Sequence, residues 1–69
     1  MWRVHVKAHD VRRWHVPERV AVVPAVSAEA ACALVVGWAL TDAQVPPLRS
    51  LTAISLAYAT AEPVPEVTA

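Results

Sequence analysis

Glycine and cysteine are almost missing from this 69-residue sequence, which contains one of each. The lone glycine, Gly37, excludes the familiar glycine-rich loops that cradle phosphate groups. The lone cysteine, Cys32, cannot form an internal disulfide, whereas small secreted domains with little core normally depend on several. Residues after Met1 also lack the basic region and apolar block of a secretory signal. We therefore expect a protein of a reducing compartment, the cytoplasm.

Net charge is also lacking, because six basic side chains balance six acidic ones and the isoelectric point is about 6.8. A dedicated nucleic-acid-binding domain is usually far more basic. The charges are nevertheless unevenly distributed. Residues 1–20 carry five basic and two acidic side chains, whereas residues 21–69 carry one basic and four acidic side chains. The N-terminal segment is therefore a candidate for binding an anionic partner.

Phenylalanine and asparagine are absent, whereas alanine and valine are abundant and 57% of the residues are hydrophobic. A chain this short has more apolar side chains than one small core can cover. We therefore expect self-association into a homo-oligomer. The compositional bias is typical of a GC-rich genome and is consistent with a phage or mobile-element source.

One long apolar stretch, residues 20–40, has the length of a membrane span. Pro24 and Ser27 interrupt it, and Glu29 places a carboxylate near its middle, where charge is costly in hydrocarbon. We therefore expect no membrane partner.

The N-terminal third of the chain predicts a β-hairpin. Apolar and polar residues alternate over residues 2–9, which is typical of a half-buried strand. Residues 10–13 form a polar turn. Residues 14–23 predict a returning edge or bulged strand, because Pro17 removes one donor from its hydrogen-bond ladder.

The remainder predicts a helix, a strand and a tail. Ser27 is suited to cap a helix over residues 28–43, which the two prolines at 46 and 47 would end. Alternation over residues 51–60 predicts a third strand. Residues 61–69, which contain prolines and glutamates, predict a flexible tail.

Together these elements define the fold class α+β, as a single β-β-α-β domain over residues 1–60. A right-handed crossover favours a three-stranded sheet of order 2-1-3, with one helix packed on one face. We expect Ala31, Leu34 and Trp38 to face this sheet, with Trp38 meeting Trp2. The helix is apolar nearly all round, so we expect either a second stripe of the helix or an exposed strand edge to be covered by a second copy of the chain. The candidate oligomer interface is therefore Ala33, Val36 and Leu40.

The alternation at the N-terminus also predicts a row of cationic side chains on the open face of the sheet. With the exposed hairpin turn, it gives these candidate interaction residues: Arg3, His5, Lys7, His9, Arg12, Arg13 and Trp14. Such a surface could bind nucleic acid, with Trp14 as a stacking platform, or an acidic protein partner. An ordinary solvated sheet face would have the same pattern.

Other chemistry has little support in the sequence. His5 and His9 would lie about 13 Å apart on an extended strand, too far to share one metal ion. Cys32 has no neighbouring base and is typical of a small buried side chain. No carboxylate pair or nucleophile–base pair is indicated by spacing. We therefore expect no enzyme activity, cofactor or metal site.

The sequence thus supports two hypotheses of different kinds. The first is a small, cytoplasmic, non-catalytic module that self-associates and serves in assembly or protein interaction. The alternative is a nucleic-acid-binding accessory protein that uses the basic N-terminal hairpin.

Overall fold

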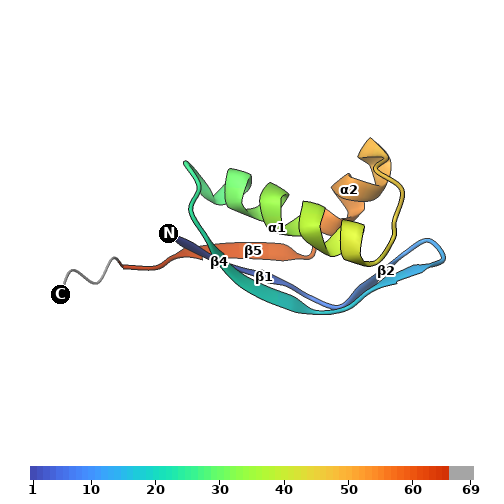
Figure 1. Ribbon diagram of the computed structural model, residues 1–69, viewed down its shortest axis with the longest axis horizontal. Helices are drawn as coiled ribbons and strands as arrows, with labels where there is room; N and C mark the ends of the chain where they lie inside the picture. The colour runs from blue at the N-terminus through green and yellow to red at the C-terminus, as the bar shows by residue number, and fades with distance from the viewer. Residues whose placement is uncertain (66–69) are drawn as a thin grey trace.

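The computed structural model describes residues 1–65, over which the chain forms five strands and two helices (Figure 1). In chain order the elements are β1 (Trp2–Val6), β2 (His9–Val11), β3 (Trp14–Val16), β4 (Arg19–Val23), α1 (Ala28–Asp42), α2 (Arg49–Leu56) and β5 (Ala59–Pro63). The fold is a small α+β domain, as predicted.

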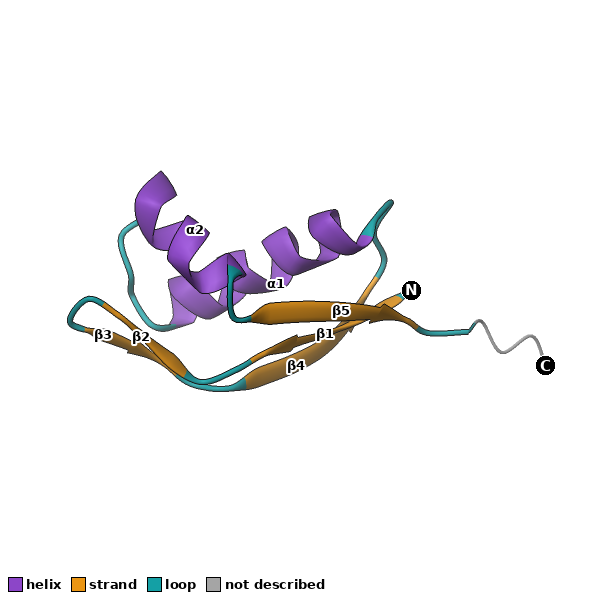
Figure 2. Ribbon diagram, turned by 180° about the vertical axis from the view of Figure 1, so that it is seen from behind, coloured by secondary structure: helices purple, strands orange, loops and turns teal. Residues whose placement is uncertain are grey.

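The main sheet has the order β4-β1-β5, with both neighbours antiparallel to β1. Figure 2 shows α1 and α2 on the same side of this sheet, so no helix within residues 1–65 covers its other face. Val4 and Val6 of β1 face the helices and are fully buried. The first strand is central, as in the predicted order, but the strand after the helices is a different segment from the predicted one, so the exact predicted topology is not confirmed.

The first four strands are the two arms of one long, bent hairpin. Its tip is the two-residue turn Arg12–Arg13, and β2 and β3 form a separate two-stranded ribbon next to the tip (Figure 1). The registers of the ribbon and of the β1–β4 ladder are in step and place Ala8 opposite Pro17. Because proline has no N–H to donate, the ladder is interrupted there.

This interruption reverses the face that the hairpin turns towards the helices. Even-numbered residues are buried in β1, such as Val4, whereas odd-numbered residues are buried in β2, namely His9 and Val11. The returning arm changes in step, from Val16 in β3 to Val23 in β4. Alternation therefore placed His9 on the wrong face, and Asp10 and Val11 belong to β2 rather than to the predicted turn over residues 10–13.

Helix α1 agrees with the helix predicted over residues 28–43. The Ser27 hydroxyl accepts a hydrogen bond from the Ala30 N–H, as an N-cap does. At the other end, Gln44 adopts a left-handed φ of 61°, and the Val45 N–H donates to the Leu40 carbonyl. This pattern is a Schellman motif, so the helix ends before the prolines are reached.

The prediction of which α1 residues face the core was right for Ala31 but wrong for Leu34 and Trp38. Its buried residues are Ala31, Val35, Val36, Ala39 and Leu40. Leu34 and Trp38 are exposed instead, and Trp2 bonds through its indole N–H to the Ala25 carbonyl rather than meeting Trp38. Because α1 is apolar nearly all round, periodicity could not choose a side.

The third predicted strand is also wrong in position, because residues 49–56 are helical. Leu51 and Ser55, four residues apart, share a helical face and are buried. Alanine and serine between the larger side chains fit both a period of two and a helical period. The strand follows as β5, so residues 61–63 belong to the sheet and not to the predicted tail, and residues 66–69 lie outside the described part.

Candidate interaction surfaces

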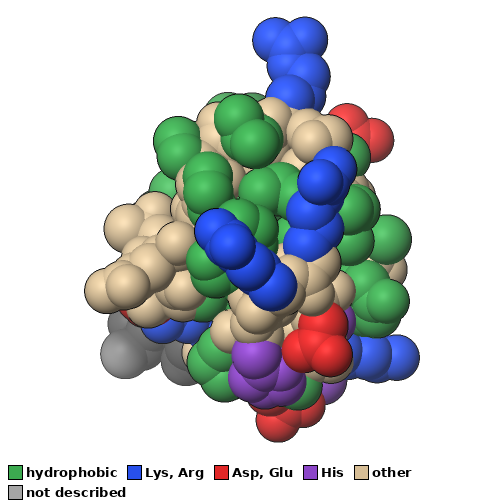
Figure 3. Space-filling model, turned by 90° about the vertical axis from the view of Figure 1, so that its right-hand side faces the viewer, with side chains coloured by type: hydrophobic (Ala, Val, Ile, Leu, Met, Phe, Trp, Pro, Cys, Tyr) green, Lys and Arg blue, Asp and Glu red, His purple; other side chains and the backbone are tan. Residues whose placement is uncertain are grey.

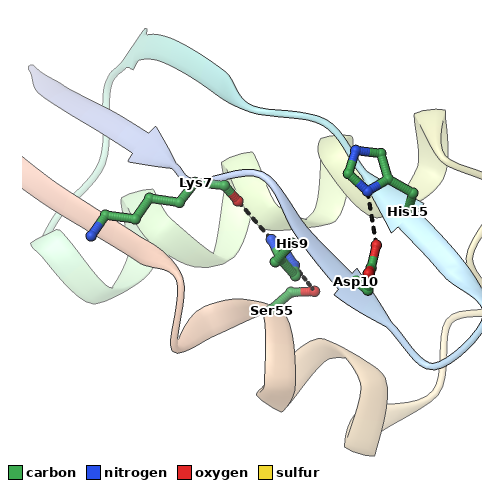
Figure 4. Close-up of polar contacts among 5 residues, drawn as sticks. All are labelled: Lys7, His9, Asp10, His15 and Ser55. Carbon is green, nitrogen blue, oxygen red and sulfur yellow. Dashed lines mark hydrogen bonds and ion pairs between the residues drawn. The ribbon is translucent and has the colours of Figure 1, made fainter.

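The predicted cationic row is broken at His9, which is 6% exposed. Its Nδ1 lies 2.7 Å from the Lys7 carbonyl oxygen, and its Nε2 lies 2.9 Å from Ser55 Oγ (Figure 4). Since a carbonyl oxygen can only accept, Nδ1 carries a hydrogen and donates it. The His9 ring also stacks on Tyr58, with ring centroids 4.4 Å apart. The buried His9 side chain thus connects the hairpin to α2.

The His9–Ser55 contact joins an imidazole to a hydroxyl, the pair of groups that many nucleophilic enzymes use. Sequence spacing did not reveal it, because 46 residues separate the two. Ser55 is only 1% exposed, so a substrate has no access to its hydroxyl in this conformation. The pair links α2 to the hairpin.

The uncovered face of the main sheet carries the first part of the predicted row. Arg3 forms an ion pair with Glu62, its register partner on β5. His5 Nε2 lies 2.8 Å from Glu18 Oε2. Arg3 and His5 thus have carboxylate neighbours. Lys7, the next residue of the predicted row, is exposed and forms no ion pair within residues 1–65. A shallow hollow of about 440 Å³ lies among Arg3, His5 and Glu62, but the charged and titratable groups that line it already have partners.

Two valines of β4 extend this open face towards one edge of the sheet. Val20 is 59% exposed and Val22 is 50% exposed. Register places Val20 on one side of His5 and Thr60 of β5 on the other. Within residues 1–65 no strand pairs with the outer edge of β4. The open face is therefore apolar at its β4 edge and polar at its β5 edge.

The hairpin end carries the second part of the predicted interaction residues. The Arg13 guanidinium carbon lies 4.7 Å from the centroid of the Trp14 ring, a cation–π contact. Trp14 was expected to be exposed but is half-buried and packs against the core. Arg12 has a φ of 54°, the left-handed region that glycine and asparagine favour.

A second hollow, of about 400 Å³, opens at this end between the hairpin and the start of α2. Its lining residues are Arg12, Arg13, Trp14, Leu48 and Leu51. Figure 3 shows this end of the molecule, where Lys and Arg side chains rise around hydrophobic surface. Asp10 and His15, which pair across the ribbon at 2.8 Å, lie on its outer side and do not line the hollow (Figure 4).

The predicted oligomer interface on α1 is not a surface of the molecule. Val36 and Leu40 are buried in the core, so they cannot contact a second chain without unfolding. Ala33 is exposed, and so are Leu34 and Trp38, whose side chain is 45% exposed. The exposed apolar surface of α1 thus lies on the side opposite to two of the three predicted residues.

Cys32 lines a third hollow, of about 390 Å³, between α1 and β5. Burial raises the pKa of its thiol, because the thiolate is poorly solvated there. A raised pKa lowers the thiolate fraction at neutral pH and makes the side chain less reactive. Among residues 1–65 no three potential metal ligands gather at one point.

No family model, curated protein or solved structure matches the chain. No helix within the described residues is long and apolar enough to cross a membrane. The class of protein is therefore given by the fold alone, a small α+β domain with helices on one face of an antiparallel sheet.

Proposed function

We propose that this protein is a small, non-catalytic module that self-associates through the β4 edge of its main sheet and serves in assembly or protein interaction. The observation that carries the proposal is the unpaired outer edge of β4 beside the exposed Val20 and Val22. An apolar edge strand is a ready template for another strand, which proteins otherwise protect.

The two edges of the sheet differ in this protection. Within β5, Glu62 adds a charge and Pro63 lacks an N–H donor, and both features disfavour strand addition. Strand β4 has neither proline nor acidic residue, and its one charged residue, Arg19, is paired with Asp42 of α1. The β4 edge is therefore the better site for an antiparallel partner strand.

A second copy of the chain fits this edge well. Two β4 strands related by a two-fold axis would place Val20 and Val22 of both copies on one continuous open face. In the resulting six-stranded sheet these valines would lie beside one another across the new strand pair, so each would be less exposed to water than in the monomer. A cytoplasmic location fits the single thiol, Cys32, which has no partner for an internal disulfide.

Sedimentation of matched variants tests the proposal. Val20→Lys and Thr60→Lys place the same charge on either side of His5, one at each edge of the sheet. We expect the wild type to be a dimer at roughly 50 µM, and Val20→Lys to raise the dissociation constant by about tenfold or more. Thr60→Lys should leave it within about threefold. Thermal melting confirms that both variants fold.

Other outcomes would overturn the proposal in distinct ways. A wild-type monomer at that concentration removes self-association altogether. A dimer that Trp38→Lys disrupts and Val20→Lys leaves intact places the interface on α1 instead of β4.

A further inference from the structure

We infer that the hairpin end binds single-stranded nucleic acid, with Arg12, Arg13 and Arg49 contacting phosphates beside an aromatic and apolar hollow. This inference uses a surface distinct from the β4 edge and does not depend on self-association.

The first observation is a contrast in charge pairing. Arg3 and Arg19 each contact a carboxylate, Glu62 and Asp42 respectively. By contrast, Arg12, Arg13 and Arg49 form no ion pair with any residue from 1 to 65, and no carboxylate lines the hollow between the hairpin and α2. The arginines around this hollow therefore have no carboxylate partner, although the chain as a whole is neutral.

The start of α2 adds to this positive potential. Arg49 is exposed in the first turn of α2 and directly follows Leu48, which lines the hollow. The first turn of a helix is the positive end of its dipole, where acidic residues are stabilising and basic ones are not. This turn contains no acidic residue. An anionic ligand beside Arg49 would relieve the repulsion.

The second observation is the surface between the charges. Trp14 and the half-exposed Leu48 give the hollow an apolar wall, and the Arg13 guanidinium is held over the Trp14 ring. Nucleic-acid bases stack on aromatic rings and on guanidinium planes. Single-strand-binding surfaces combine such stacking surfaces with cations that follow the backbone. The hollow at the hairpin end has both a stacking surface, Trp14, and cations, Arg12 and Arg13.

The third observation is the backbone at Arg12. A left-handed φ at a non-glycine residue costs on the order of 1 kcal/mol, and glycine or asparagine would adopt it more easily. The turn therefore holds an arginine at a position where folding alone favours a different residue. Such a local strain is typical of positions that are retained for binding.

A single strand fits this end better than a duplex or an acidic protein. The outer face of the ribbon presents Asp10, which would oppose the phosphates lining a duplex groove. A carboxylate partner would use the arginines but has no use for the stacking surface. Three phosphate contacts predict a slope of about −2 when the logarithm of affinity is plotted against that of salt concentration.

Fluorescence anisotropy with a labelled 12-nucleotide oligothymidine tests the inference. We expect binding at about 50 mM salt that weakens by about tenfold or more at about 200 mM. Arg12→Gly, Arg13→Gln and Arg49→Gln should each weaken binding by about threefold to tenfold and make the salt slope shallower by about 0.7. Arg12→Gly also relieves the strained turn, so weaker binding there cannot come from unfolding.

The matched control is Arg3→Gln, which removes one positive charge from the neutralised sheet face and should change affinity by less than about twofold. An equal loss in Arg3→Gln would show nonspecific attraction and overturn the site. No binding of oligothymidine at about 50 mM salt would also overturn the inference. So would tighter binding of a duplex of the same length, or of a polyglutamate peptide. Val20→Lys and Thr60→Lys leave the hairpin end intact, so failure of the dimer leaves this inference standing.

Discussion

The open sheet face and the hairpin end use the same kinds of side chain with opposite results. On the sheet, Arg3 faces Glu62 because the register of β1 and β5 makes them cross-strand neighbours. At the hairpin tip, Arg12 and Arg13 form the turn itself, and no strand within residues 1–65 pairs with them to supply a carboxylate. A basic side chain is thus neutralised within a sheet and left available at a turn. The difference locates candidate anion binding at the hairpin end, while the sheet offers an apolar edge.

The hairpin end depends most strongly on Leu51, which is buried beneath its hollow. Leu51→Ala should lower the free energy of unfolding by about 2 to 4 kcal/mol, because it leaves a cavity under the ribbon. Ile54→Ala removes an exposed side chain of the same helix and should cost less than about 1 kcal/mol. Urea denaturation followed by circular dichroism measures both. The reverse ranking would mean that residues 51–60 form the strand expected from alternation.

His9 of the ribbon and His5 of the open sheet face should differ in their contribution to stability, because only His9 is buried. His9→Ala should destabilise the protein by about 2 kcal/mol, since it leaves the Ser55 hydroxyl and the Lys7 carbonyl without their partner. His5→Ala removes only an exposed contact with Glu18 and should cost less than about 0.5 kcal/mol. Denaturant titration of the two variants compares them directly. Equal losses would contradict the burial of one and the exposure of the other.

A substitution at the strained turn should stabilise the protein, whereas the substitutions above destabilise it. Arg12→Gly should raise the free energy of unfolding by about 0.5 to 1 kcal/mol, because glycine adopts a left-handed φ freely. Arg13→Gly removes the same charge at a neighbour without a left-handed φ and loses the contact with Trp14, so it should be destabilising. Thermal melting of the two variants gives the sign. A loss of stability in Arg12→Gly would show that the turn is not strained.

The smallest effect on stability is expected for the ion pair of Arg3 and Glu62 on the sheet. A double-mutant cycle of Arg3→Ala and Glu62→Ala should give a coupling energy below about 0.5 kcal/mol, because both side chains are exposed. The coupling should fall further as salt screens the pair. A coupling above about 1.5 kcal/mol, measured by denaturation, would instead make the open face a rigid and stabilising element.

Local patterns predicted much of the fold. Alternation in β1 identified Val4 and Val6 as core residues, and Ser27 identified the start of α1. The predicted helix and the observed one differ by a single residue at the end. These features depend on side chains and backbone groups within a few residues of one another, which a sequence pattern records directly.

The candidate sites were predicted only in part. Arg12, Arg13 and Trp14 do lie together, because a two-residue turn holds neighbours at one place. Burial of His9 was missed, since the reversal at Ala8 and Pro17 changes which face of the hairpin is covered. Arg49 was not a candidate, because only the packing of α2 beside the ribbon brings it to the hairpin end.

By itself the sequence determined a hairpin, a capped helix and an excess of apolar side chains, because strand alternation, helix capping and composition are local properties. Tertiary structure alone decided which side of the uniformly apolar α1 is buried and that residues 49–56 are helical. It also decided which arginines have carboxylate partners. Arg3 and Glu62 are 59 positions apart in the chain, and only the register of β1 with β5 brings their charges into contact.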